Sequence, residues 1–323
     1  MRVVEAKAFG GPEVLAVHEA PDPVAGPGQV VVDVAVVDTL FLEAQIRSGA
    51  GGEYFGVRPP YVPGGGIAGR VAAVGEGVDP GWSGRRVVTR TGVEGGYAER
   101  AAVPAETLVE VPDGVDLREA AALAHDGVTA LGLFEAARVR PGERVLVTGA
   151  SGGMGVLLVQ LAHAAGAWVA GTARGARKTE TVRGLGADAV LDPSAPGWAE
   201  RVRELTGGAG ADVVYDGVGG RIGREAFGAV ARGGRFSAHG SPTGSFAEIT
   251  PEEAAERGVR LRGIRDVQFP PAEARRLTGR ALAEAATGRL RPVIGRTFPL
   301  ERAADAHAAI EARDVVGKTL LVV

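Results

Sequence analysis

The segment from Arg144 to Lys178, RVLVTGASGGMGVLLVQLAHAAGAWVAGTARGARK, constrains the fold more than any other part of the chain. An apolar strand at Val145 to Thr148 leads into a glycine-rich turn, and a helix follows that stops at Gly166. The turn has the G-x-G-x-x-G spacing with alanine first, which gives a tight turn, a bare backbone for a pyrophosphate and close helix packing. We expect the phosphates to lie at the helix N-terminus, on Ala150, Ser151, Gly152, Gly153, Met154 and Gly155.

The residues after the second strand favour NADPH over NADH. An NAD site places an acidic residue about 20 residues beyond the turn, on the ribose hydroxyl, but no Asp or Glu occurs between Gly155 and Glu180. Basic groups stand there instead, and they attract a 2′-phosphate. The coenzyme contacts predicted in this stretch are Thr172, Arg174, Arg177 and Lys178. The alternative is a solvated basic loop, which equal affinities for NADPH and NADH would support.

Two patterns divide the chain. Up to about residue 120, short strands alternate with Gly and Pro turns, which predicts a compact β-rich domain. From Arg144 onward strands alternate with helices, which predicts a parallel sheet covered on both faces. We expect a long helix from Ala120 to Val139 between the two parts. The strands expected in the second part are 145–148, 168–171, 189–191, 213–215, 235–238 and 259–263, and GKTLLVV forms a last strand.

Composition excludes several classes of protein. The 323 residues carry a net charge of −3 and no cysteine, so disulfides, thiolate nucleophiles and cysteine-ligated zinc are excluded. No basic stripe with aromatic residues favours nucleic acid, and no apolar run reaches the roughly 18 residues of a membrane span. The N-terminal residues lack the pattern of a signal peptide, so we expect a cytoplasmic protein.

An ordered series of motifs resembles the zinc-independent quinone oxidoreductase branch of the medium-chain dehydrogenase/reductase superfamily. The motifs are FGGPEVL, IRSG, PYVPGGGIAGRVAAVGEGV, GGYAE, GVTAL, VLVTGASGGMG, GADVVYDGVGG and GKTLLVV, which together cover nearly the whole chain. The resemblance implies an α/β protein with a GroES-like catalytic domain, residues 1–120 and 266–323, and a Rossmann domain with a doubly wound parallel sheet, residues 121–265.

The resemblance also tests for zinc and for the substrate. The zinc-ligand positions of alcohol dehydrogenases fall on Leu40, Gly65, Gly66 and His125, which cannot supply three or four donors. A Tyr-x-x-x-Lys pair is absent as well, since Val3, Arg174 and Asp314 precede the three lysines by four residues. Quinones and α,β-unsaturated carbonyls are already electrophilic, so holding them against NADPH can supply most of the catalysis. We therefore expect a metal-free reductase of a small quinone or enone.

The remaining site residues are assigned with alternatives. By resemblance Thr129 lies near the nicotinamide, and His125, with Asp126 beside it, could supply a proton; each also fits a purely structural role. Tyr54 and Tyr61 could donate to an enolate, although a packed turn tyrosine fits equally well. Ligands of parallel sheets lie beyond the carboxyl ends of the strands, so we also predict coenzyme contacts at Val218, Gly240 and Ser241, which follow two of the strands. Lys318, in the last strand, is a further predicted contact.

Departures from the branch leave other functions open. Leu40, Glu43 and Gln45 stand where many relatives have Asn, Asp and Tyr, and Pro193 stands where some have a tyrosine near the adenosine phosphate. Two alternatives remain: an enoyl-thioester reductase, and an NADPH-binding protein without turnover. The resemblance further implies a homodimer that pairs through Gly258 to Ile264.

Overall fold

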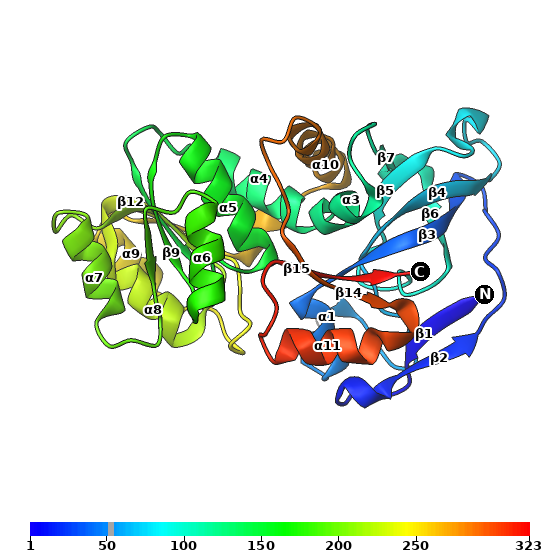
Figure 1. The fold of residues 1–323 in the computed structure, drawn as a ribbon, viewed down its shortest axis with the longest axis horizontal. Helices are drawn as coiled ribbons and strands as arrows, with labels where there is room; N and C mark the ends of the chain where they lie inside the picture. The colour runs from blue at the N-terminus through cyan, green and yellow to red at the C-terminus, as the bar shows by residue number, and fades with distance from the viewer. Residues whose placement is uncertain (51–54) are drawn as a thin grey trace. The chain divides into compact units, whose positions relative to one another are not determined.

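The computed structural model describes residues 1–50 and 55–323, which form two compact units (Figure 1). The first unit consists of Met1–Val128 and Pro271–Val323, so both ends of the chain contribute to it. The second unit is the continuous segment Thr129–Pro270.

The first unit is built on a seven-stranded sheet of order β14-β15-β3-β4-β5-β7, and β6 also pairs with β3. Its β-branched strands bury one apolar cluster that includes Val32, Val37 and Ile67. The strands are β3 (Gln29–Thr39), β4 (Gly66–Val74), β5 (Arg86–Arg90), β6 (Arg100–Pro104), β7 (Val109–Glu110), β14 (Ile294–Pro299) and β15 (Lys318–Val322), with β1 (Arg2–Ala6) and β2 (Leu15–Glu19) as a separate antiparallel pair.

The helices near Val128, where the first unit gives way to the second along the chain, correct one sequence prediction. Instead of one helix from Ala120 to Val139, the chain forms α3 (Leu117–Leu123) and α4 (Asp126–Ala137), separated by Ala124 and His125. Helix α3 packs against β3 and β4, so a domain boundary after residue 120 would cut it. Gly127 lies at a close approach, because a Cβ there would stand 3.0 Å from the Cβ of Ala281. The other helices of the first unit are α1 (Phe41–Arg47), α10 (Pro271–Ala286) and α11 (Ala303–Glu311).

The second unit is the predicted parallel sheet with helices between its strands. Six strands have the order β10-β9-β8-β11-β12-β13, and every pair is parallel. The strands are β8 (Arg144–Thr148), β9 (Trp168–Thr172), β10 (Ala189–Leu191), β11 (Ala211–Asp216), β12 (Val230–Ala238) and β13 (Arg260–Arg262). The helices are α5 (Gly153–Ala164), α6 (Ala176–Gly184), α7 (Trp198–Leu205), α8 (Gly220–Gly228) and α9 (Pro251–Glu256).

Parallel pairing determines where the functional side chains gather. Helix α5 packs against β8 and β9, whereas α8 packs against β8, β11 and β12. Because the strands are parallel, the carboxyl ends of β9, β8, β11 and β12 meet at one edge of the sheet. The predicted coenzyme residues, apart from Lys318, therefore belong to this edge.

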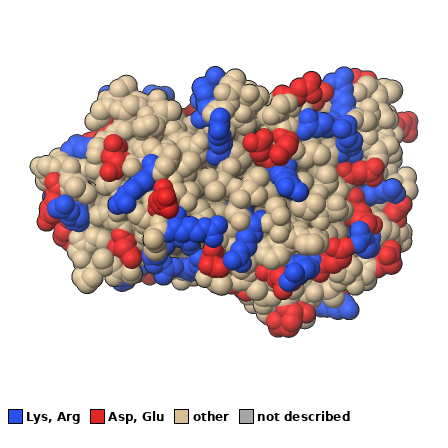
Figure 2. Space-filling model, in the orientation of Figure 1, with Lys and Arg blue, Asp and Glu red and all other residues tan. Residues whose placement is uncertain are grey.

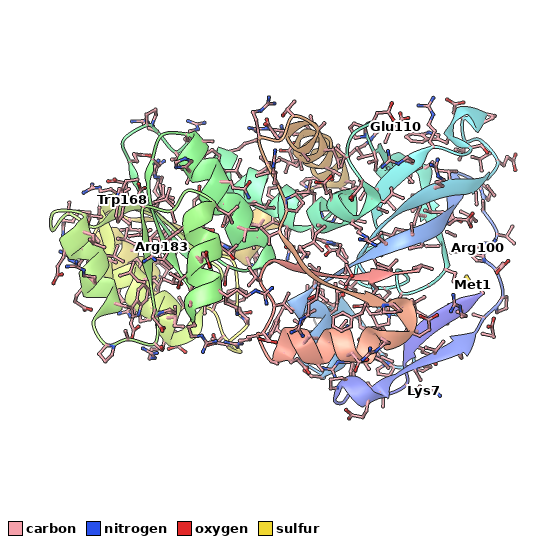
Figure 3. All side chains as sticks on the ribbon, in the orientation of Figure 1. Met1, Lys7, Arg100, Glu110, Trp168 and Arg183 are labelled. Atoms are coloured by element: carbon pink, nitrogen blue, oxygen red, sulfur yellow. The ribbon has the colours of Figure 1, made fainter. Side chains whose placement is uncertain are left out.

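Charged side chains of both signs are interspersed over the face shown in Figure 2. Many are paired: the Met1 amino group and Arg100, both labelled in Figure 3, form ion pairs with Asp22. In residues 1–50 and 55–323, no helix is both long enough and apolar enough to cross a bilayer.

Candidate functional site

The glycine turn after β8 has the geometry of an anion site. A Cβ on Gly155 would stand 2.4 Å from the carbonyl oxygen of Gly149, so only glycine lets α5 begin this close to the turn. Gly152 is the exposed residue before α5, and Gly153 and Met154 begin the helix half-buried. The first amide groups of a helix have no partner within it, and they favour an anion.

The turn is held from behind by β9. Thr172 is buried, and its Oγ1 accepts a hydrogen bond of 3.0 Å from the Gly149 amide, while the Ala150 amide donates to the Thr172 carbonyl. Ala150 and Ser151 are buried at the same place. Thr172, predicted to contact the coenzyme, therefore fixes the shape of the turn.

The predicted basic residues follow β9 directly. Arg174 and Arg177 are exposed, and Lys178 is half-buried in the first turn of α6. The pKa of the Asp192 carboxyl is lowered mainly by hydrogen bonds from Ser194, with a smaller contribution from the charge of Arg174. The basic groups thus lie at the carboxyl end of the strand next to the glycine turn.

The turns after β11 and β12 are locked to each other. Asp216 is buried, and its Oδ1 accepts from the amides of Val218 and Gly219 and from the Thr148 hydroxyl, so this carboxylate caps the turn. A Cβ on Gly240 would stand 2.2 Å from the Gly217 carbonyl oxygen, so these backbones touch. The predicted residues Val218, Gly240 and Ser241 are half-buried at this edge.

His239 lies at the same edge, and the sequence reasoning missed it. Its side chain is buried, and its Nδ1 lies 3.2 Å from Ser237 Oγ. Burial lowers the pKa of His239 to about 4. The available signal was its position, because it directly follows an apolar strand and precedes Gly240, where ligands of parallel sheets lie.

The first unit contains a buried cluster of charges, formed by Asp38, His125, Asp126 and Lys318. The Lys318 Nζ lies 2.5 Å from Asp38 Oδ1 and 3.0 Å from Asp126 Oδ2. The His125 Nδ1 lies 3.2 Å from the other Asp38 oxygen. Strand register explains the meeting, because Leu320, two residues after Lys318, pairs with Asp38. Asp38 was not singled out from the sequence, although an acid ending an apolar strand was a usable signal.

The charges of this cluster shift one another's pKa values. Burial alone would raise the pKa of Asp38, but Lys318 and His125 lower it overall. Burial raises the pKa of Asp126, and Lys318 opposes part of that rise. Burial would lower the pKa of Lys318, yet the two carboxylates raise it. Since Lys318 is 4% exposed and twice paired, its charge is already neutralised within the first unit.

His125 is held as a neutral ring. Burial lowers its pKa, and the charge of Arg90 adds to this effect, while Asp38 opposes it. The ring packs against two glycines, since a Cβ on Gly66 would stand 2.9 Å from Nδ1 and one on Gly65 would stand 3.1 Å from Cε1. The imidazole therefore fills the space that side chains at these positions would need.

A second polar network surrounds Glu43. The buried carboxylate accepts from the amides of Leu40 and Gly65 and from the Tyr97 hydroxyl, which also lies 2.8 Å from His307 Nε2. Burial raises the pKa of Glu43 to about 7, and it lowers that of His307 to about 3. His307 is fully buried in this network.

The predicted catalytic residues have different surroundings. Tyr61 is buried, and no hydrogen bond to its hydroxyl is found in the described part of the chain; burial raises its pKa to about 12. Thr129 is half-buried on α4, three positions after Asp126. Tyr54 lies outside the described residues.

The residues at the expected metal positions do not fit zinc. Leu40, Gly65 and Gly66 offer no side-chain donor, and His125 is engaged with Asp38. Apart from positions 51–54, which are not described, no three His, Asp or Glu side chains form a group that could hold a metal ion.

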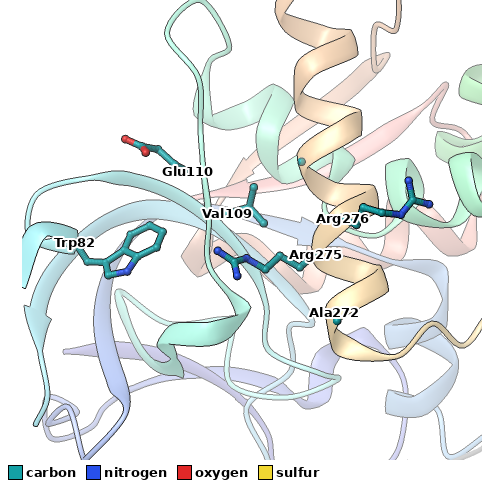
Figure 4. Close-up of a pocket in the computed structure, with 7 residues that line it drawn as sticks. Trp82, Val109, Glu110, Ala272, Arg275 and Arg276 are labelled. Carbon is teal, nitrogen blue, oxygen red and sulfur yellow. The ribbon is translucent and has the colours of Figure 1, made fainter. Parts of the chain in front are cut away.

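A separate hollow on the first unit contains none of the predicted site residues (Figure 4). Its wall combines β7 and the Trp82 side chain with one face of α10, including Arg275. We do not assign the site to it, because the groups with shifted pKa values lie elsewhere.

The fold and the glycine turn define a two-unit chain with a dinucleotide-binding type of α/β unit. Residues 26–113 match the alcohol dehydrogenase GroES-like domain family, and residues 153–278 match the zinc-binding dehydrogenase family. Quinone oxidoreductase from Sus scrofa is 33% identical over 99% of this chain and 97% of its own length. A 2-haloacrylate reductase from Burkholderia sp is also 33% identical, over 97% of this chain and 96% of its own.

A solved structure gives the same result. Escherichia coli quinone oxidoreductase, complexed with NADPH, superposes with a TM-score of 0.92 at 26% identity and full coverage of both chains. The chain belongs to the quinone oxidoreductase branch of the medium-chain dehydrogenase/reductase superfamily. The resemblance recognised in its motifs and the expected fold class, a GroES-like unit with a Rossmann unit, are confirmed.

Proposed function

We propose that this chain is an NADPH-dependent oxidoreductase that reduces quinones or other α,β-unsaturated carbonyl compounds. The observation that carries the proposal is the edge of the second unit, where the glycine turn and two exposed arginines follow neighbouring strands. The names of the similar proteins, quinone oxidoreductase and 2-haloacrylate reductase, support a conjugated substrate.

The residues of the second unit fit the coenzyme. Gly155 keeps the start of α5 against the turn, so the helix amides would hold the pyrophosphate. Arg174 and Arg177 would pair with the 2′-phosphate, with Lys178 next to them on α6. The other half of the coenzyme, with the nicotinamide, would lie along Val218, Gly240 and Ser241. We leave Lys318 out of these contacts, because its charge is paired with Asp38 and Asp126.

Bound NADPH would supply the hydride. The chain's own residues would bind and orient the substrate, and we keep Thr129, His125, Tyr61 and Tyr54 as candidates for that role. The Tyr61 phenol stays protonated over the whole neutral range, since burial raises its pKa from 10.0 to about 12. The neutral ring of His125 is better suited to accept a hydrogen bond than to release a proton.

We also propose a homodimer. β13 (Arg260–Arg262) is the last strand of its sheet, so its outer edge is open to pair with the same strand of a second copy. Light scattering at several protein concentrations would show the mass of one chain if this part is wrong. The cytoplasmic location stays a prediction from the sequence.

The experiment that tests the reaction combines one substitution with a substrate panel. Gly152→Val is suited to it, because Gly152 has φ −80° and ψ 169°, which valine adopts readily. A Cβ there meets only the Gly149 oxygen, at 3.3 Å, so the fold should tolerate the change while the side chain blocks the pyrophosphate. Gly184→Val in α6 is the matched control, because nothing lies within 4 Å of its Cβ position.

Anaerobic NADPH oxidation would be followed with quinones, enals, cyclic enones and enoyl thioesters. We expect turnover with quinones or enones in the unmodified chain and in Gly184→Val, and its loss in Gly152→Val at unchanged melting temperature. Turnover with enoyl thioesters alone would favour the thioester alternative. NADPH binding without any turnover would favour the alternative of an NADPH-binding protein that is not an enzyme.

A further inference from the structure

His239 is a buried polar side chain at the edge of the second unit's sheet where the carboxyl ends of β9, β8, β11 and β12 meet. It is 6% exposed and follows the last residue of β12. Its Nδ1 faces Ser237, whereas no hydrogen bond to Nε2 is found in the part of the chain that the structure describes. His239 Nε2 is not among the fully buried side-chain atoms without a partner in the described residues, so the small exposed part of the ring includes this nitrogen.

The ring is directed along the strand ends. A Cβ on Gly217, the residue after β11, would stand 3.4 Å from His239 Nε2 and 3.5 Å from the Thr148 carbonyl oxygen. Nε2 therefore lies close to Gly217, the residue that follows β11. The orientation is fixed from behind, because the amides of His239 and Gly240 both donate to the Asp216 carbonyl.

The strand order indicates which part of a dinucleotide would come here. The basic residues follow β9 and the glycine turn follows β8, while β11 and β12 continue the sheet on the other side. A coenzyme whose 2′-phosphate lies after β9 and whose pyrophosphate lies after β8 must extend its nicotinamide half over β11 and β12. That half would meet Gly217 and His239.

We propose that His239 is a positioning residue for the nicotinamide half of the coenzyme, where Nε2 accepts a hydrogen bond from a ribose hydroxyl or from the carboxamide NH₂. This inference rests on the proposed function. Burial lowers the pKa of His239 to about 4, so the ring is neutral at pH 7. We assign its proton to Nδ1, because Ser237 offers acceptors there, and Nε2 then presents a lone pair.

The test compares NADPH with 2′,5′-ADP, which lacks the nicotinamide mononucleotide half. His239→Phe keeps a flat aromatic ring, larger by one atom, and removes both nitrogens, while His239→Gln retains a polar end near Nε2. We expect His239→Phe to weaken NADPH binding about three- to tenfold by calorimetry, the effect of one neutral hydrogen bond, and to leave 2′,5′-ADP binding unchanged. His239→Gln should regain most of the affinity. His18→Phe, on β2 in the first unit, is the control.

A spectroscopic measurement on the unmodified chain covers the case in which a variant does not fold. With ¹⁵N-labelled histidine, the Nε2 resonance of His239 should move on saturation with NADPH and stay in place with 2′,5′-ADP. The 3-acetylpyridine analogue, which lacks the amide NH₂, should abolish the shift if the carboxamide is the donor and preserve it if a ribose hydroxyl is.

Two results would overturn the inference: an Nε2 resonance that NADPH does not move, or a folded His239→Phe that binds NADPH as the unmodified chain does. Failure of the proposed function gives a different pattern, because neither NADPH nor 2′,5′-ADP would then bind the unmodified chain.

Discussion

Lys318→Met should destabilise the first unit strongly. The ammonium is 4% exposed and lies 2.5 Å from Asp38 and 3.0 Å from Asp126, so its removal leaves two buried carboxylates without their common partner. Removing one partner of a buried ion pair costs about 3–5 kcal/mol. We expect a loss of this size in the free energy of unfolding at pH 7, measured by urea titration. Lys7→Met, at an exposed lysine labelled in Figure 3, should change it by less than about 0.5 kcal/mol.

The loss should depend on pH in a defined direction. Without Lys318, burial raises the pKa of both aspartates above their values in the unfolded chain, although His125 still offsets part of this for Asp38. A raised pKa contributes stability that is lost as the pH rises through it, so the variant's deficit should be larger at pH 8 than at pH 5. Adding Asp126→Asn should recover part of it. Equal deficits at both pH values, or a deficit no larger than that of Lys7→Met, would refute the reasoning.

Two further predictions concern single groups. Burial raises the pKa of Glu43 from 4.5 to about 7, so the free energy of unfolding should fall by about 3 kcal/mol as the pH rises from 4.5 to 7. In urea titrations at stepped pH, Glu43→Gln should make the free energy of unfolding depend less on pH over this range. An unchanged pH dependence would contradict the prediction. Arg177→Ala should weaken NADPH binding at least about tenfold and leave NADH binding unchanged, while Arg183→Ala at the other end of α6 (Figure 3) should affect neither; equal effects on both coenzymes would favour the solvated loop.

The parts of the fold that depend on local pattern could be predicted. The strand at Ala189–Leu191 has the expected bounds, and the glycine turn begins a helix as expected, because apolar runs and glycine spacing determine these locally. The helix from Ala120 to Val139 was wrong. Its apolar pattern continues across Ala124 and His125, but the tertiary contact of His125 with Asp38 competes with helical geometry there.

The charge cluster could not be predicted, because it depends on strand register. Asp38 and Lys318 belong to opposite ends of the chain, and only the antiparallel pairing of β3 with β15 brings them together. Lys318 was predicted as a coenzyme contact because it begins the last strand, which returns from the catalytic domain. Its burial between two carboxylates depends on contacts that no local pattern encodes.

The buried polar groups of the first unit are paired with one another, whereas some of those in the second unit are still able to bind a ligand, and this difference indicates where a ligand binds. In the first unit the buried charges of Asp38, Asp126 and Lys318 compensate one another, so a ligand would gain little by competing for them. In the second unit Thr172 fixes the glycine turn that leads into α5, and the Asp216 carbonyl fixes the backbone of His239, while Nε2 of His239 takes no part in those contacts. Groups that are fixed and still able to form a hydrogen bond need little reorganisation on binding. The coenzyme edge is thus preformed by its own strand ends.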